Sequence, residues 1–167
     1  MKRKKRKHKN QMGREEKTVF DDYDDMRETL NNQVPEILES ARYMEMIDFW
    51  GNEEIPMYFY YENLEHLFID LLDGKIKDAG LLGRVLDFME NMANSKDGGV
   101  QNLLHVQILE GLFGLERDVF ISMEKMLGPK TKEILETVKT GFYEPNGYVP
   151  IKTSSQNPKR KKRKRPK

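Results

Sequence analysis

The sequence predicts an all-α fold, a single compact bundle of about six or seven short antiparallel helices flanked by disordered basic tails. Three observations predict it. Apolar residues recur at spacings of three and four along most of the chain, which is the period of one helix face. Glycine and proline stand where these segments end and begin. No segment shows a convincing strand alternation, and 167 residues allow one domain.

The first half of the body is expected to form three helices, over residues 20–31, 35–49 and 57–73. Four Asp fall on the first turns of the first helix, where the helix dipole favours negative charge. Pro35 suits the first turn of the second helix, and Gly74 stands where a helix-ending glycine is expected. The predicted buried stripes are Phe20, Tyr23, Met26 and Leu30, then Leu38, Ala41, Met44 or Met46, Ile47 and Phe49, then Leu64, Leu67, Phe68, Leu71 and Leu72.

The second half is expected to form four helices, over residues 79–94, 100–114, 116–127 and 130–142. Asp78 is the expected N-cap of the first of these, because its carboxylate can accept hydrogen bonds from the first turn. A polar loop at 95–99 separates the first two helices, which form a predicted helical hairpin. Gly128 and Pro129 end one helix and begin the next.

Charge is segregated along the chain, although the formal net charge is only +1. Residues 1–10 hold seven Lys or Arg and residues 158–167 hold eight, with no acid in either segment. The sequence between them carries 28 acids against 14 bases, a formal charge of −14. An acidic body therefore separates two basic ends. The expected organisation is a disordered basic tail over 1–18, an acidic helical domain over 19–145, and a second disordered basic tail over 146–167.

Several classes of protein do not fit this composition. The chain has no cysteine, which excludes disulfides and thiolate metal sites. No stretch approaches 18 apolar residues, so no membrane-spanning helix is expected, and the basic start lacks the apolar core of a signal peptide. We therefore expect a cytoplasmic protein, or a nuclear one if its source or host is eukaryotic and the tails act as address signals.

No residue pattern predicts catalysis or a cofactor. Glu62, Glu65 and His66 lie close on one helix, but their spacing does not match the Glu-x-x-His pairs of a di-iron bundle. His105 and Glu110 are five apart and are expected to point to different faces. The acidic run at 21–25 lacks the glycine and glutamate of a calcium loop. We predict no enzyme, no cofactor and no metal site.

The two tails carry a repeated cationic hexapeptide, KRKKRK, at residues 2–7 and 159–164. Such segments bind phosphate backbones through counterion release, and they also match nuclear address signals. Three interpretations stay open: binding of nucleic acid or an anionic surface, an address signal or added tag, and loose folding back on the acidic body. The candidate nucleic-acid-binding residues are Lys2, Arg3, Lys4, Lys5, Arg6, Lys7, Lys159, Arg160, Lys161, Lys162, Arg163, Lys164 and Arg165.

Three segments between residues 63 and 137 occur together in a recognisable pattern. They are LFIDLLDGK, VLDFMENMANSKDGGVQNLLHVQILEGL and MLGPKTKEIL. The pattern resembles a bacterial family of small all-helical proteins classed as a domain of unknown function. Some of its members look like immunity proteins encoded beside secreted toxins. The resemblance implies a helical fold without an active site, and an immunity-like role implies a surface complementary to a basic toxin.

Two functions are expected from these features. The first is a non-enzymatic helical protein-binding module, immunity-like, with a basic protein partner. The second is a nucleic-acid-associated protein held by its tails. For the first, the predicted protein-binding residues are Asp21, Asp22, Asp24, Asp25, Glu53, Glu54, Tyr58, Tyr60 and Tyr61. The tyrosines are candidate anchors because this residue type dominates binding hot spots, and core packing is their alternative role.

Overall fold

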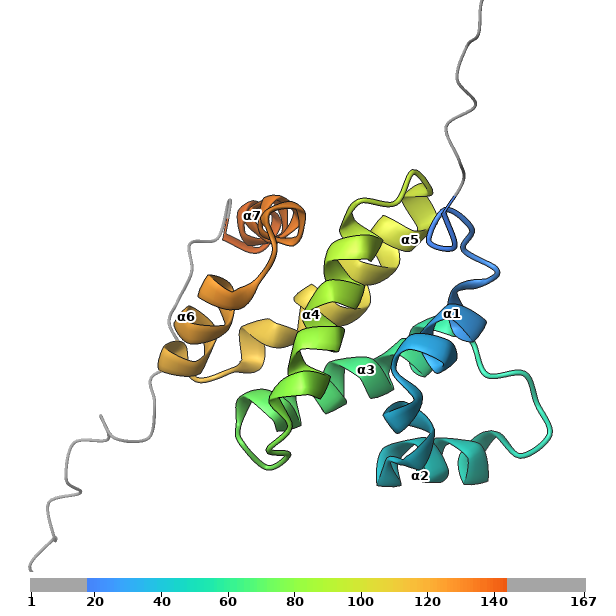
Figure 1. Cartoon of the computed structure of the whole chain (residues 1–167). Helices are drawn as coiled ribbons and strands as arrows, with labels where there is room; N and C mark the ends of the chain where they lie inside the picture. The colour runs from blue at the N-terminus through green and yellow to red at the C-terminus, as the bar shows by residue number, and fades with distance from the viewer. Residues whose placement is uncertain (1–17, 144–167) are drawn as a thin grey trace, which may run out of the picture.

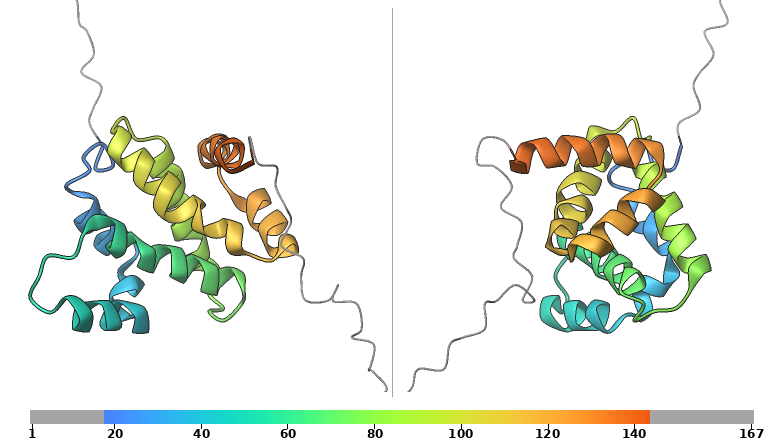
Figure 2. Two further views of the ribbon diagram at one scale, coloured as in Figure 1. Left: turned by 180° about the vertical axis from the view of Figure 1, so that it is seen from behind. Right: turned by 90° about the vertical axis from the view of Figure 1, so that its left-hand side faces the viewer.

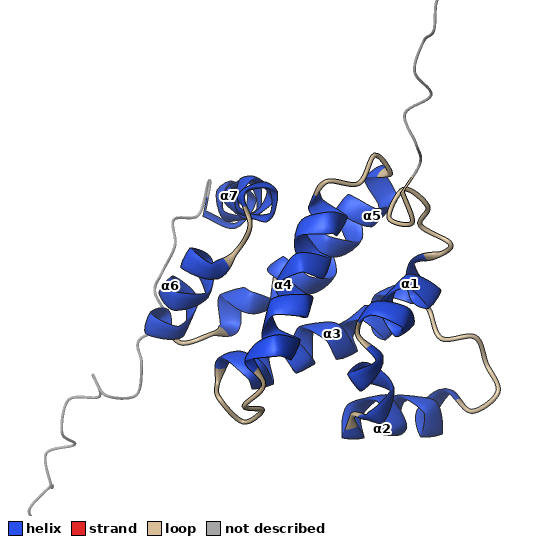
Figure 3. Cartoon of the chain, viewed as in Figure 1, coloured by secondary structure: helices blue, strands red, loops and turns tan. Residues whose placement is uncertain are grey.

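The computed structural model describes residues 18–143, and that part of the chain is helical with no strand (Figure 3). The predicted all-α fold is confirmed. The α-helices are α1 (Met26–Gln33), α2 (Ala41–Trp50), α3 (Met57–Leu72), α4 (Ala79–Ala93), α5 (Gly98–Leu103), α6 (Arg117–Met126) and α7 (Pro129–Tyr143). Two short 3-10 turns, η1 (Pro35–Glu39) and η3 (Gly111–Gly114), and one π-helical turn, η2 (Leu104–Leu109), connect them.

The helices are arranged around α3 and α4, which lie at the middle of the molecule (Figure 1). Helices α1 and α2 lie at one end and α6 and α7 at the other, in both of the opposite views (Figure 2). The core is filled by side chains from α3, α4 and the segment from α5 through η3. Its fully buried members include Leu64, Phe68, Val85, Met89, Leu103, Leu104, Ile108 and Leu112.

The first predicted helix begins later than expected, and the prediction of a helix from Phe20 is wrong. Helix α1 begins at Met26, and the acidic run before it forms turns. The side chain of Asp21 accepts hydrogen bonds from the backbone N–H of Thr18 (2.8 Å) and of Lys96 (2.7 Å). Aspartate carboxylates compete with helical backbone bonds in this way. Phe20 nevertheless reaches the core, where it is 5% exposed.

The second predicted helix is split in two at Ser40, whose Oγ accepts a hydrogen bond from the backbone N–H of Tyr43 (3.1 Å). The preceding 3-10 turn has fewer residues per turn than an α-helix, so the apolar stripe changes phase across the break. As a result, Ile37 is buried in place of Leu38, and α2 has no buried residue at all. The predicted burial of Phe49 is wrong, because this side chain is 83% exposed.

The remaining boundaries follow the predicted punctuation closely. Asp78 caps α4 through a hydrogen bond from the N–H of Leu81 (2.8 Å). Gly74 has a positive φ of 70° after α3, and Pro129 is the first residue of α7. The helix predicted over 100–114 starts at Gly98 instead, because Asp97 caps it by accepting a bond from the N–H of Gly99 (2.7 Å). The prediction of one continuous helix there is wrong, because α5 ends at Leu103 and the chain continues as η2 and η3.

Candidate functional site

Two of the exposed aromatic side chains, Phe49 and Phe59, lie together between α2 and α3. Eight large hydrophobic residues are exposed within the described part of the chain. Half of them belong to α2 and to the first turn of α3, namely Met44, Phe49, Tyr58 and Phe59. Scattered exposed apolar residues need no explanation, but a contiguous set marks an interaction surface or a ligand groove. The surface between α2 and α3 is therefore the candidate site.

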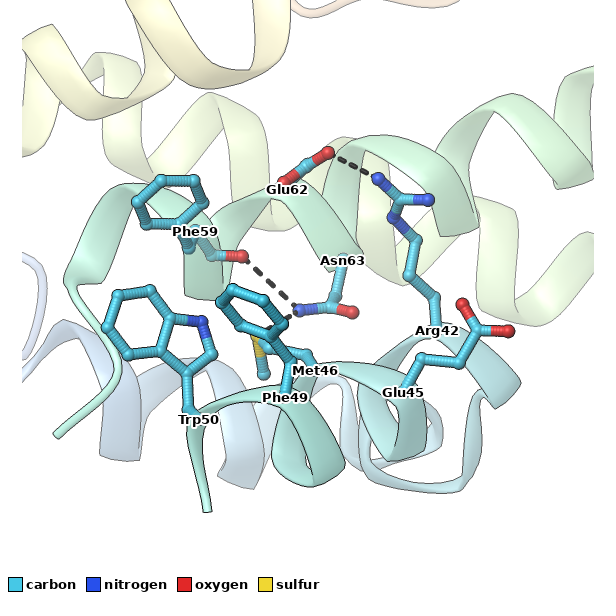
Figure 4. Close-up of a pocket in the computed structure, with 8 residues that line it drawn as sticks. All are labelled: Arg42, Glu45, Met46, Phe49, Trp50, Phe59, Glu62 and Asn63. Carbon is cyan, nitrogen blue, oxygen red and sulfur yellow. Dashed lines mark hydrogen bonds and ion pairs between the residues drawn. The ribbon is translucent and has the colours of Figure 1, made fainter. Parts of the chain in front are cut away.

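A groove of about 460 Å³ opens between α2 and α3 (Figure 4). One side of it is aromatic, because the Trp50 ring lies between the rings of Phe49 and Phe59 at centroid distances of 5.8 and 5.6 Å. Trp50 is the only tryptophan of the chain. The groove is lined by Arg42, Glu45, Met46, Phe49, Trp50, Phe59, Glu62 and Asn63. We call this set the α2–α3 groove.

The connection between α2 and α3 is fixed by α1. Gly51 ends α2 with a positive φ of 58°, a conformation that glycine adopts without a Cβ clash. Ile55 is 5% exposed, and its carbonyl accepts a hydrogen bond from the guanidinium of Arg27. The same guanidinium lies 4.5 Å from the centre of the Tyr60 ring. These contacts fix the α2–α3 connection and the start of α3 against α1.

The other side of the groove is polar. Arg42 and Glu62 form an ion pair across it, from α2 to α3, and the carboxylate of Glu45 lies at the rim (Figure 4). Asn63 lies at the floor and is 3% exposed. Its amide nitrogen donates to the Tyr60 carbonyl (3.0 Å), but its Oδ1 has no partner among the described residues. A buried acceptor without a donor destabilises a fold by about 1–3 kcal/mol.

Negative charge is concentrated in the half of the body that contains this groove. Residues 18–74 carry fifteen acids and two bases, whereas residues 75–143 carry ten acids and nine bases. Arg42 is the single base between residues 28 and 74 and is already paired with Glu62. The groove therefore lies in a negative field, which attracts cationic ligands and repels anionic ones.

The predicted acidic residues take different roles in the structure. Asp21 holds the loop between α4 and α5, and the backbone N–H groups of Lys96 and Thr18 lower its pKa. Asp22 accepts a hydrogen bond from the backbone N–H of Asp24 (3.3 Å). The side chains of the other four candidates are exposed, and these are Asp24, Asp25, Glu53 and Glu54.

The three candidate tyrosines divide between surface and core. Tyr58 is 38% exposed, and its hydroxyl accepts a hydrogen bond from Asn102 (2.8 Å). Tyr60 and Tyr61 are 2% and 0% exposed, so both take the alternative role of core packing. Tyr61 donates to the Met26 carbonyl (2.9 Å), and burial raises the pKa of Tyr60 to about 12. A tyrosine held in this way offers no surface to a partner.

Sequence reasoning missed the aromatic pair that forms one wall of the groove. Apolar spacing predicts a buried Phe49 and does not distinguish Trp50. The predicted nucleic-acid-binding residues, at 2–7 and 159–165, lie outside the described residues.

The histidine and glutamate pairs differ from expectation in one respect. His105 and Glu110 were predicted to face apart, but His105 Nε2 lies 3.6 Å from Glu110 Oε1. The reason is the π-helical turn, in which the N–H of Glu110 bonds to the carbonyl of His105 and residues five apart align. His66 likewise lies 3.6 Å from Glu62. No group of three or more such side chains within residues 18–143 could hold a metal ion.

Glu65 is the carboxyl group with the most perturbed environment near the groove. It packs against Gly111, where an added Cβ would lie 1.8 Å from Glu65 Oε1. Burial, and next the neighbouring carboxylate of Glu62, raise the pKa of Glu65 to about 7, against an ordinary value of 4.5. Arg42 opposes this shift. The folded state therefore favours the protonated form of Glu65.

The folded protein is expected to lose stability between pH 4.5 and 7 as Glu65 ionises. The folded-state pKa lies above the unfolded value, so the folded state binds more protons in this window. The loss is about 1–2 kcal/mol, because partial exposure screens part of the 1.4 kcal/mol expected per unit. Glu65→Gln removes this loss, and urea unfolding at pH 5 and pH 8 measures it. Exposed Glu116→Gln is the control. If Glu65→Gln loses as much stability between pH 5 and pH 8 as the original protein, the assignment to Glu65 is contradicted.

The fold and the groove together define a small all-α domain with an open aromatic and acidic surface. The chain belongs to the family described as a domain of unknown function, DUF7674, whose model matches residues 27–144. The expected membership of a family of unknown function is thus confirmed, over a longer range than the three motifs covered. No curated protein and no solved structure matches the chain. Within the described residues, no helix is long and apolar enough to cross a membrane.

Proposed function

We propose that the chain is a non-enzymatic protein-binding module, and that its partner docks on the α2–α3 groove. The observation that carries the proposal is the exposure of Phe49, at 83%, beside Trp50 and Phe59 in a groove of defined shape. Leaving such an aromatic side chain in water forgoes about 1.5–3 kcal/mol of burial energy. Binding a partner recovers that energy, and aromatic side chains are the usual anchors of protein interfaces.

The partner is expected to be a basic protein. The half of the body that contains the groove carries fifteen acids and two bases, so its field favours a cationic surface. Such complementarity raises the association rate and rejects acidic competitors. A nuclease toxin with a basic cleft is a partner of this kind. An immunity-like role, in which the chain covers that cleft, is the particular form of the proposal.

The proposal is tested by placing a photo-crosslinking amino acid at position 49 and, as a matched control, at position 121. Ile121 is a large apolar residue on α6 and is 38% exposed. Figure 1 shows α6 at the opposite end of the molecule from α2. In cells of the source, we expect one basic protein to crosslink at position 49 and not at 121. The purified partner should then bind Phe49→Ala at least about tenfold more weakly than Ile121→Ala.

Two results would contradict the proposal. One is the same set of crosslinked proteins at both positions, which indicates non-specific contact. The other is an unchanged affinity of the crosslinked partner for Phe49→Ala. Because Phe49 is exposed and its truncation leaves no cavity, the variant is expected to fold normally. Its urea unfolding curve verifies this before binding is measured.

A further inference from the structure

We propose that the polar end of the α2–α3 groove binds a Lys or Arg side chain, and that its occupant in the free protein is the chain's own C-terminal run, residues 159–165. The proposal rests on the proposed function, since it names a ligand for the same groove. It explains three features together: an unsatisfied acceptor, a negative rim and an aromatic wall.

The first feature is the acceptor at the floor. The amide nitrogen of Asn63 bonds to the Tyr60 carbonyl at 3.0 Å, with the Phe59 carbonyl at 3.4 Å, so the orientation of the amide is fixed and Oδ1 points the other way. Figure 4 shows this oxygen directed toward the side of the groove that holds Arg42 and Glu45. Oδ1 can only accept hydrogen bonds, and no described residue donates one. The matching ligand atom is therefore an N–H or O–H donor.

The second feature selects a charged donor. The carboxylate of Glu45 lies on the side of the groove toward which this oxygen points (Figure 4), has no ion-pair partner among the described residues, and is exposed. A guanidinium or ammonium group satisfies both a carboxylate and an amide oxygen, because it carries several N–H donors and a positive charge.

The third feature accommodates the rest of the side chain. Lys and Arg have an apolar stem that packs on apolar surface while the charged head stays polar. The rings of Phe49, Trp50 and Phe59 form such a surface, with the Trp50 ring 5.8 and 5.6 Å from its two neighbours. Aromatic faces also attract cations directly. The groove thus offers a stem site and a head site in one place.

Chain length favours the C-terminal run as the occupant. Fifteen residues, 144–158, join α7 to the run at 159–165. Fully extended they span about 50 Å, whereas a domain of this size is about 36 Å across. The ten residues 8–17, which join the other basic run to the described body, span only about 35 Å. The C-terminal run therefore has the longer tether, and it carries seven consecutive cations against six in residues 2–7.

An occupied groove has a consequence for any partner. The partner must displace residues 159–165. Its apparent dissociation constant is therefore the intrinsic value divided by the fraction of protein in which the groove is open. Removing the positive charge of the run is therefore expected to strengthen partner binding at the groove. Salt is also expected to release residues 159–165 from the groove, because it screens exposed ion pairs.

Trp50 reports directly on the groove, because no other tryptophan contributes to the fluorescence of the chain. The full chain is compared with a variant in which all seven residues 159–165 are Gln. We expect the Trp50 emission to differ between the two at low salt and to coincide in 0.5 M sodium chloride. A synthetic peptide of residues 158–167 should then bind the variant saturably and restore the emission of the full chain.

Groove variants make the peptide titration specific. Glu45→Gln is expected to weaken the peptide about fivefold, as for loss of one exposed ion pair. Glu116→Gln, at the exposed residue that precedes α6, is the matched control and should leave the affinity unchanged. Phe49→Ala should weaken the peptide by a similar factor. A peptide of residues 1–9 contains the same KRKKRK hexapeptide and tests which of the two runs occupies the groove. If it binds more tightly than the peptide of residues 158–167, the assignment to the C-terminal run is overturned.

The inference and the proposed function fail separately. Identical Trp50 emission in the two chains, with no saturable binding of the 158–167 peptide, overturns the inference. If position 49 still crosslinks one partner in that case, the proposed function stands. If the peptide binds and no partner crosslinks at position 49, the groove is a site for the chain's own run, and the proposed function fails.

Discussion

Phe88→Ala is expected to destabilise the protein by about 3–5 kcal/mol, the range observed for truncating a buried phenylalanine. The Phe88 side chain is 1% exposed on α4. Its ring meets that of Phe20 edge-on at 5.2 Å and lies 6.4 Å from the ring of Tyr61. Truncation removes contacts to both the segment before α1 and to α3. Because domains of this size are stable by about 5–15 kcal/mol, much of the total is lost.

Urea unfolding followed by circular dichroism measures the effect as a lower midpoint with an unchanged slope. Phe49→Ala is the matched control, because it is the same truncation at a side chain that is 83% exposed. Phe49→Ala should leave the free energy of unfolding within about 0.5 kcal/mol of that of the original protein. A change of less than 1 kcal/mol in Phe88→Ala would mean that the N-terminal segment does not pack on α4 as described.

The helix boundaries at Gly74, Asp78 and Pro129 are predictable from the sequence because their signals are local. The Asp78 carboxylate accepts a hydrogen bond from the first turn of α4, and Gly74 and Pro129 act through their own backbone preferences. Each of these signals lies within a few residues of the boundary that it sets. No long-range contact competes with it, so the local preference decides the structure.

The start of α1 was not predictable in the same way. The carboxylate of Asp21 bonds to the backbone of Lys96, 75 residues away, and that of Asp97 accepts from the backbone N–H of Tyr23 (3.0 Å). These contacts join two loops and hold the acidic run in turns. Nothing within residues 20–31 indicates that a distant loop will supply the partner. Tertiary context overrides a weak helix propensity in such cases.

The groove was predicted only in part. The sequence predicts an acidic body and aromatic anchors at Tyr58, Tyr60 and Tyr61, but the fold buries Tyr60 and Tyr61. The exposed ring is that of Phe49, on a helix whose stripe changed phase at Ser40. A shift of phase by less than one turn exchanges buried for exposed positions. Sequence periodicity cannot detect this when the break is a single capping serine.

Glu90→Ala is expected to destabilise the protein by about 2–4 kcal/mol, through the loss of a cap that α4 supplies to α7. The Glu90 carboxylate accepts from the backbone N–H of Lys130 (2.9 Å), and from the N–H (3.0 Å) and hydroxyl (2.8 Å) of Thr131. Thr131 is fully buried, so the truncation leaves its hydroxyl without that acceptor. The carboxylate also lies against Gly128, where an added Cβ would come within 2.2 Å of it.

The same contacts give this carboxylate a pH dependence opposite to that of Glu65. Partial burial alone would raise the pKa of Glu90, but the hydrogen bonds from Thr131 and Lys130 outweigh it and lower the pKa below its usual value of 4.5. The contribution of the Glu90 carboxylate to the free energy of unfolding is therefore complete above about pH 4.5. It is lost as the pH falls through the lowered folded-state pKa. Glu90→Gln keeps one acceptor oxygen but no charge, so it should lose less stability than Glu90→Ala.

Thermal unfolding at pH 3 and pH 6 separates these contributions. The original protein should lose stability on acidification, and Glu90→Gln should lose less, because the group that titrates is absent. Gly128→Ala provides a second route to the same cap, since its methyl group must push the Glu90 carboxylate away from α7. If Gly128→Ala is destabilising alone but has no further effect in Glu90→Ala, the two residues act through one contact. Additive losses would show that Gly128 serves the turn between α6 and α7 independently of Glu90.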